Sequence, residues 1–308
     1  MDWRTNSTRL TTSVAKMRTV HDEYGTGFAA VVAFIMQRSR LAHPPFHSVP
    51  YQPGPTRAST WTVHDDHVSF VRAAPAPVIA RVSAEPQAIE FDLARSALVV
   101  IDMQNDFCHA QGWFGCKGID VAPMRAPFAT IATLTDALRA AGARVVWLNW
   151  GIRADRANLP ASVLYRGKRS ADAAGYGEAS SADRGPSLVQ GSWGAAQVDE
   201  LRAQAGDLAV VKHRLSGFWD SELDSVLRRA AITTLFFAGI NTDRCVFSTL
   251  QDAGFLGYDC VLVEDACATP SPRYVSDAIV FMVRQLHGFT TTSAALLASL
   301  PTRPKESP

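Results

Sequence analysis

The 308-residue sequence lacks both a strong excess of charge and a long apolar run. Its 30 Lys and Arg nearly balance its 29 Asp and Glu, leaving a formal net charge of +1, so no nucleic-acid partner is expected. The apolar run at residues 27–36 is about half of the ~20 residues that a membrane-spanning helix needs. No small-x-small cleavage pattern follows this run, so the sequence favours a protein that is neither secreted nor bound to a membrane.

The sequence also lacks any Cys-x-x-Cys pair, and its cysteines are odd in number. A disulfide framework uses an even number of cysteines, and a zinc ribbon uses closely spaced pairs. Neither is therefore expected, and the composition favours a reduced, cytoplasmic protein. The five cysteines are Cys108, Cys116, Cys245, Cys260 and Cys267.

Regular patterns are missing from the first part of the chain, where repeated prolines interrupt every period. We assign residues 1–85 to an N-terminal extension or arm, residues 86–302 to one folded domain and residues 303–308 to a tail. The extension is expected to be either a poorly ordered leader or a strap that packs on a neighbouring subunit.

From residue 97 onward, strand patterns alternate with helical ones. Residues 97–102 form a continuous apolar run that ends in an acid, which is typical of a strand buried on both faces. The alternation predicts an α/β fold with a doubly wound, Rossmann-like and mostly parallel sheet, covered by helices on both faces as three layers, α/β/α. Further strands are expected at 143–150, 207–213, 233–240 and 258–266, a polar insertion at 151–195, and helices at 126–143, 196–204, 221–231, from 245 and at 273–287.

Reactive residue types stand at the carboxyl ends of three of these strands, where open α/β sheets form their sites. Asp102 ends the first strand, Lys212 ends the third and Cys245 follows the fourth. A thiol becomes a strong nucleophile when it ionises, and the amides of a helix beginning at residue 246 together with the Lys212 ammonium would favour the anion. Asp102 would accept the thiol proton and later return it to a leaving amine. The three residues therefore suit acyl transfer.

Attack on an amide carbonyl creates an oxyanion, for which the backbone N–H groups of Asn241 and Cys245 are the candidate donors. Each member of the constellation also has an ordinary structural interpretation. A cysteine beside apolar residues is often a small core residue, an aspartate after a strand often caps a turn, and a lysine at a strand end is usually solvated. Composition and spacing alone leave both interpretations open.

Three segments resemble the motifs of the isochorismatase-like cysteine hydrolases, in the order and at the spacing of that family. They are VVIDMQNDF at residues 99–107, VVKHRLSGF at 210–218 and GINTDRCV at 239–246. The resemblance covers about residues 86–300 and implies that 86–302 is a hydrolase domain.

The resemblance assigns the family's catalytic triad to Asp102, Lys212 and Cys245. It also implies a cis peptide bond between Ile240 and Asn241. The family usually has alanine where this chain has Asn241, so a polar side chain is expected near the site.

Within the family, the chain most resembles ureidoacrylate amidohydrolases, although Leu215 stands where that group is expected to have tyrosine. This implies hydrolysis of a C–N bond in a small ureido or carbamoyl compound through a covalent acyl-enzyme, with release of carbamate and ammonia. Biuret, triuret, N-carbamoyl amino acids and simple carboxamides such as nicotinamide or maleamate are alternative substrates. A catalytically silent scaffold whose arm recruits a partner is the alternative outside the enzymes.

Related nicotinamidases bind a metal through Asp and His residues after the second strand, where this chain reads NWGIRAD and has no histidine. We therefore expect no metal and no other cofactor. Family members assemble as dimers or tetramers, so a homo-oligomer is expected. The candidate substrate contacts lie just beyond strand ends: Asn149, whose amide can both donate to and accept from a ureido group, and the aromatic residues Phe107, Trp113, Trp150, Phe218 and Trp219.

Overall fold

The computed structural model describes residues 60–72 and 76–301, which divide into two units by their internal contacts. In the first unit, Thr60–Val71, the strands β1 (Thr62–Val63) and β2 (Val68–Ser69) pair antiparallel. Residues 1–59 of the predicted extension and the predicted tail at 303–308 lie outside the described residues.

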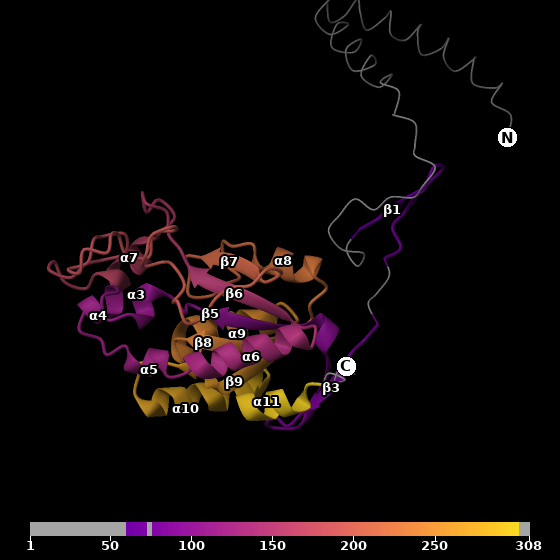
Figure 1. Cartoon of the computed structure of the whole chain (residues 1–308). Helices are drawn as coiled ribbons and strands as arrows, with labels where there is room; N and C mark the ends of the chain where they lie inside the picture. The colour runs from indigo at the N-terminus through magenta and orange to yellow at the C-terminus, as the bar shows by residue number, and fades with distance from the viewer. Residues whose placement is uncertain (1–59, 73–75, 302–308) are drawn as a thin grey trace, which may run out of the picture. The chain divides into compact units, whose positions relative to one another are not determined.

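A six-stranded sheet forms the centre of the second unit (Figure 1). Its strand order is β10-β9-β8-β5-β6-β7, and every neighbouring pair is parallel. This arrangement confirms the predicted doubly wound α/β fold. The strands in chain order are β5 (Ser96–Ile101), β6 (Arg144–Trp150), β7 (Leu208–Lys212), β8 (Thr234–Ile240), β9 (Asp259–Ala268) and β10 (Phe289–Thr291).

Helices cover both faces of the sheet, as successive residues of β6 show. The Trp147 indole donates to Asp207, which also pairs with Arg139 on α6. The neighbouring Leu148 packs on the opposite face against Gly217, whose N–H donates to Thr249 on α9. With neighbours on both sides and helices above and below, all six residues of β5 are buried, as its unbroken apolar pattern predicts.

The helices vary in length, and several short ones follow β5. In chain order they are α3 (Asn105–Cys108), α4 (Trp113–Cys116), α5 (Ala122–Arg125), α6 (Phe128–Ala140), α7 (Ala161–Gly167), α8 (Leu223–Arg229), α9 (Phe247–Phe255), α10 (Arg273–Met282) and α11 (Ser293–Ser299), with a 3₁₀ turn η3 (Leu93–Arg95) and π-helical turns η4 (Thr242–Val246) and η5 (Val283–His287). The predicted helices at 126–143, 221–231 and 273–287 correspond to α6, α8 and α10 with η5.

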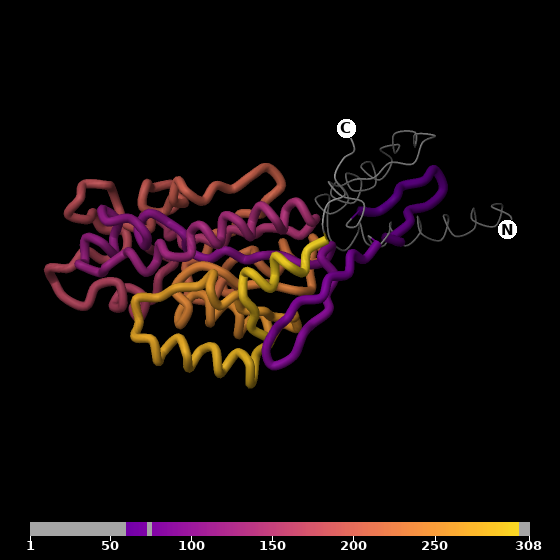
Figure 2. Tube along the Cα trace, turned by 60° about the horizontal axis from the view of Figure 1, so that its bottom comes forward, coloured from indigo at the N-terminus to yellow at the C-terminus, as the bar shows by residue number. Residues whose placement is uncertain are grey.

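An antiparallel hairpin precedes the sheet and consists of β3 (Ile79–Val82) and β4 (Ile89–Asp92). Its first strand contacts α11, and Figure 2 shows the purple hairpin beside the yellow helix. Glu85, in the connection between the two strands, pairs with Thr290 of β10 through two backbone hydrogen bonds of 2.9 Å. The hairpin is therefore attached to the edge strand of the sheet.

The prediction of a helix at residues 196–204 is wrong, because this segment consists of turns and irregular backbone. Its backbone instead pairs with the segment that follows β5. The N–H of Asn105 donates to Ala196 at 3.0 Å, and the N–H of Val198 donates to Met103 at 3.1 Å. Since these groups are used in tertiary hydrogen bonds, they are not available for a helical ladder.

All five cysteines are free thiols. Within the described ranges, no helix is long and apolar enough to cross a membrane.

Candidate active site

The topology brings Asp102 and Cys245 to the carboxyl ends of two adjacent strands. The strand order changes direction between β5 and β8, which are neighbours in the sheet although β6 and β7 come between them in the chain. Open α/β sheets bind ligands at such switch points, outside the carboxyl ends of the strands. Asp102 directly follows β5, and Cys245 follows β8 within the turn η4.

Asp102 leaves the strand with a left-handed backbone, φ 56°, a conformation that aspartate tolerates better than most residues. Its N–H still donates to Leu148 of β6 at 2.9 Å, so the turn begins while the sheet pairing persists. The side chain is 2% exposed, and its Oδ2 lies 2.9 Å from Nζ of Lys212. The two side chains form a buried ion pair.

Lys212 reaches this carboxylate from the end of β7, two strands away from β5. Adjacent strands lie ~4.8 Å apart, so the interaction has to bridge about 10 Å, which suits a long side chain. On the way, Nζ lies 4.3 Å from the centroid of the Trp150 ring on β6, a cation–π contact, and it donates to Arg214 O at 3.3 Å. The side chain of Lys212 is fully buried.

Cys245 lies inside the π-helical turn η4 rather than immediately before a helix, which corrects the predicted start of that helix. The carbonyl of Asn241 accepts from the N–H groups of Arg244 and Val246, at 3.0 and 3.2 Å. The Thr249 hydroxyl donates to Cys245 O at 2.6 Å and accepts from Gly217 N at 3.0 Å. This hydroxyl therefore connects the cysteine turn to the loop that follows Lys212.

The entry to this turn depends on glycine. Gly239 has φ 109°, and a Cβ there would overlap the backbone of Ile101 on β5. Only glycine combines this conformation with so close an approach of the two strands. The peptide bond between Ile240 and Asn241 is cis, as the family resemblance implies.

Burial is the largest single influence on the pKa of each of the three residues, and it prevails for Asp102 and Cys245. It raises the pKa of the Asp102 carboxyl, although the Lys212 ammonium opposes the rise. Burial alone would lower the pKa of Lys212, but its interactions with Asp102 and Cys245 more than offset this and raise it. Burial and then the Asp102 charge raise the pKa of the Cys245 thiol to about 12, with Lys212 opposing.

This reverses the expected effect on Cys245, because helix amides and one ammonium do not compensate for its removal from water. A pKa of about 12 corresponds to a protonated thiol at neutral pH. Such a thiol would act as a nucleophile only with a base to take its proton. A carboxyl group with a raised pKa is suited to that task. Asp102 is the carboxylate that interacts directly with this thiol.

Two polar residues after Asp102 position the surrounding segments, and the sequence interpretation missed them. The Gln104 amide donates to Trp150 O at 2.7 Å and to Ala195 O at 2.6 Å, and its Oε1 accepts from Trp150 N at 2.7 Å. The buried Asp106 carboxylate accepts from Trp113 N at 3.0 Å and from Leu188 N at 2.6 Å. The sequence did contain an indication of their role. Gln104 and Asp106 are polar residues next to a strand expected to be buried, and buried polar groups need hydrogen-bond partners.

The predicted aromatic contacts fall into two groups. Trp150 lies under the Lys212 ammonium, and both it and Trp113 pack against Tyr176, with ring centroids 5.7 and 5.0 Å apart. Phe107 packs behind Trp113, 6.4 Å between centroids. The other two point to different partners: Phe218 packs against Tyr258, and the exposed Trp219 donates to Asp252 at 2.8 Å.

Tyr176 is a further candidate that the sequence did not reveal, because it lies in the polar insertion. Burial raises the pKa of its phenol; the nearby Cys245 adds to the rise, and Arg166 opposes it. A single aromatic residue between two glycines of this insertion was the only local signal. The fold brings it close to the cysteine.

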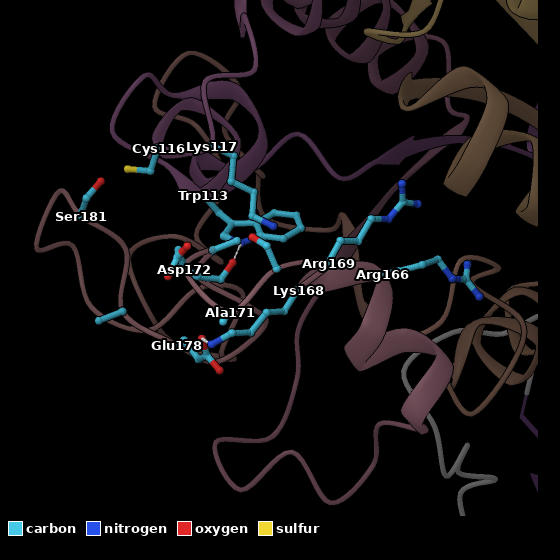
Figure 3. Close-up of a pocket in the computed structure, with 14 residues that line it drawn as sticks. Trp113, Cys116, Lys117, Arg166, Lys168, Arg169, Ala171, Asp172, Glu178 and Ser181 are labelled. Carbon is cyan, nitrogen blue, oxygen red and sulfur yellow. Dashed lines mark hydrogen bonds and ion pairs between the residues drawn. The ribbon is translucent and has the colours of Figure 1, made fainter.

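A cavity of ≈ 590 Å³ opens beside Trp113 (Figure 3). Its walls carry Lys117, Arg166, Lys168 and Arg169, and Lys168 pairs with Glu178 at 2.7 Å. Arg166 also lines a second cavity of ≈ 470 Å³, next to Trp219. Residues of the insertion line both cavities. Neither cavity is lined by Asp102, Lys212 or Cys245.

Asn149 and Asn241 both lie at the carboxyl edge of the sheet, and each has a buried side-chain oxygen without a hydrogen-bond partner in the described chain. Within residues 60–72 and 76–301, no three His, Cys, Asp or Glu side chains are grouped as a metal site requires.

The parallel sheet and its strand order define a three-layer α/β protein of the doubly wound class, with a thiol, a carboxylate and an ammonium buried at its switch point. The isochorismatase domain matches residues 96–295, which is more than half of the chain. The chain therefore belongs to the isochorismatase family.

Solved structures of several relatives share the fold. An isochorismatase family protein from Desulfovibrio vulgaris subsp. vulgaris str. Hildenborough is 30% identical, with 66% of this chain and 96% of that chain covered and a TM-score of 0.53. An N-carbamoylsarcosine amidase from Thermoplasma acidophilum is 26% identical, with 65% and 96% covered and a TM-score of 0.50. A cysteine hydrolase from Pseudomonas syringae pv. phaseolicola 1448A has the same fold at 24% identity, with 68% and 94% covered and a TM-score of 0.56.

Proposed function

We propose that this protein is an amidohydrolase that cleaves a C–N bond of a small ureido or carbamoyl compound, R–NH–CO–NH₂, with Cys245 as nucleophile. The observation that carries the proposal is the buried cluster in which Lys212 Nζ lies 2.9 Å from Asp102 and Cys245 interacts with both. Membership of a hydrolase family supports it, and so does the similarity to a solved amidase of a carbamoyl compound.

In the first step, the Asp102 carboxylate takes the Cys245 proton while Sγ bonds to the substrate carbonyl carbon. The carbonyl electron pair moves to oxygen, and the N–H groups of Asn241 and Cys245 donate to this oxyanion, an interaction worth ~3 kcal/mol for each donor. Lys212 remains protonated and stabilises the negative charge that the cluster carries. Its raised pKa is consistent with that role.

In the second step, the C–N bond breaks and protonated Asp102 gives its proton to the leaving amine, which leaves a carbamoyl group on Sγ. Asp102 then takes a proton from water as the water oxygen bonds to the carbamoyl carbon. Collapse of this intermediate releases carbamate, and the thiolate recovers its proton from Asp102. Carbamate decomposes to ammonia and carbon dioxide.

The test measures ammonia and carbon dioxide from wild-type protein and the Cys245→Ala variant. The substrates are ureidoacrylate, biuret, triuret, N-carbamoylsarcosine, nicotinamide and maleamate. We expect both gases from at least one ureido or carbamoyl compound, and a loss of at least about 1000-fold in kcat on removal of the nucleophile. Cys260→Ala is the matched control, because Cys260 is an equally buried free thiol on β9, where it donates to Leu250 O.

Ammonia without carbon dioxide would assign the protein to the simple carboxamidases instead. Turnover that survives in folded Cys245→Ala would refute the nucleophile. If the wild-type protein hydrolyses none of the compounds, the result would favour the scaffold alternative.

A further inference from the structure

Several buried side-chain atoms at and near the candidate site have no hydrogen-bond partner, although Asp102 Oδ2 forms an ion pair with Lys212. In the described part of the chain, seven buried side-chain nitrogen or oxygen atoms have no hydrogen-bond partner. Buried polar groups are normally paired, so such atoms need an explanation. All seven lie at the carboxyl ends of β5, β6 and β8 or in the segment that follows β6; they belong to Asp102 (two atoms), Asn149, Trp150, Asn158, Gln197 and Asn241.

Two of these atoms, Oδ1 of Asn149 and Oδ1 of Asn241, are neutral acceptors at the carboxyl ends of the strands that flank β5. In the sheet register, Ile101 pairs with Leu148 of β6 on one side and with Gly239 of β8 on the other. The next position along β6 is Asn149, and Asn241 directly follows β8, two positions after Gly239. Asp102 therefore leaves the sheet between these two asparagines.

Asn241 is the more constrained of the pair. Its side chain belongs to a residue that is 5% exposed, yet its Oδ1 accepts no hydrogen bond. It follows the cis peptide bond and stands four positions before Cys245 in the turn that presents the thiol. A buried carbonyl oxygen left without a donor is costly, so a ligand N–H that reaches it gains affinity.

We propose that the side-chain oxygens of Asn149 and Asn241 accept hydrogen bonds from N–H groups on both sides of the scissile carbonyl. The site is then selective for a ureido group, which carries nitrogen on both sides, over a carboxamide, which carries nitrogen on one. This inference rests on the proposed amidohydrolase function and deepens it. The two asparagines are specificity-determining residues that contact the substrate, and the bond-breaking step stays with Cys245 and Asp102.

The test uses substrates that differ in one group. In 3-ureidopropionate the inner nitrogen carries N–H, and in glutaramate a CH₂ group replaces it, with the same carboxylate at the far end. We expect wild-type protein to prefer the ureido compound in kcat/KM. We expect the double variant Asn149→Ala/Asn241→Ala to lower this preference by about 10- to 100-fold, because analogues that lack a needed N–H are rejected by buried acceptors.

Asn158→Ala is the matched control, since Asn158 has a similar unpaired oxygen but lies in the insertion. We expect it to keep the wild-type preference. The inference is overturned if the preference survives the double substitution, or if Asn158→Ala lowers it as much.

A second comparison needs no variant and therefore stands even if the double variant does not fold. N-carbamoylglycine has an inner N–H that N-carbamoylsarcosine replaces with N–CH₃. We expect wild-type kcat/KM to be at least about tenfold higher for the glycine compound, and equal values overturn the inference. Failure of the proposed function has a different signature, the absence of Cys245-dependent turnover with any of these compounds.

Discussion

Replacement of Lys212 by methionine removes one partner of the buried ion pair while keeping most of the side-chain volume. Nζ lies 2.9 Å from Asp102, and the two side chains are 0% and 2% exposed. Removing one member of a buried pair leaves an uncompensated charge and typically costs about 3–5 kcal/mol. For a domain of this size, each kcal/mol corresponds to about 2–4 °C, so a loss of about 3 kcal/mol lowers the melting temperature by about 6–12 °C.

The cost depends on pH in a defined direction. Burial already raises the pKa of Asp102, and the loss of Lys212 removes the largest influence that opposes the rise. A carboxyl whose folded-state pKa is raised destabilises the protein above its unfolded-state pKa of ~3.9. The penalty increases by about 1.4 kcal/mol per pH unit up to the folded-state pKa and then levels off. The variant should therefore be impaired least at acidic pH and most at alkaline pH.

Thermal unfolding followed by tryptophan fluorescence, at about pH 5 and about pH 8, measures this dependence. The control is Asp102→Asn/Lys212→Met, which removes both charges and should recover most of the lost stability at about pH 8. The two single variants complete a double-mutant cycle. A Lys212→Met loss that is equal at both pH values, or a double variant no more stable than Lys212→Met, would refute the uncompensated-charge reasoning.

Two further predictions concern the nucleophile and the glycine beside Asp106. Because burial raises the pKa of the Cys245 thiol to about 12, its alkylation by iodoacetamide should accelerate about tenfold per pH unit without a plateau below about pH 10; a plateau near neutrality would contradict this. Gly194→Ala should cost about 1–3 kcal/mol and lower kcat/KM, since its Cβ would overlap the Asp106 carboxylate. Gly254→Ala on α9 is the control, because the nearest atom lies at 3.5 Å, and unchanged stability of Gly194→Ala would count against the steric argument.

Much of the fold follows from local patterns in the sequence. The apolar run predicted as a strand at 97–102 is β5, and the run at 233–240 contains β8 (Thr234–Ile240). Such runs are informative because strands buried on both faces need apolar residues at every position. The triad candidates were visible for a related reason, since sites of parallel sheets form where strands end.

The error at residues 196–204 has a physical cause. This segment has apolar residues at Val198 and Leu201, a spacing that fits one face of a helix. Its backbone groups, however, pair with Met103 and Asn105, far away in the sequence. Local propensity is a weak guide when a distant segment competes for the same hydrogen bonds.

The sequence by itself determined the parallel α/β architecture and the chemical types of residue at the strand ends. It also contained the motifs that identify the family. Only the tertiary structure decided how those residues behave: burial raises the pKa of the thiol instead of lowering it, and Tyr176 comes from the insertion to the neighbourhood of Cys245. Patterns along the chain report which residues are buried. The pKa of a buried group depends on how completely water is excluded and on which charges face it, and both are set by segments far apart in the sequence.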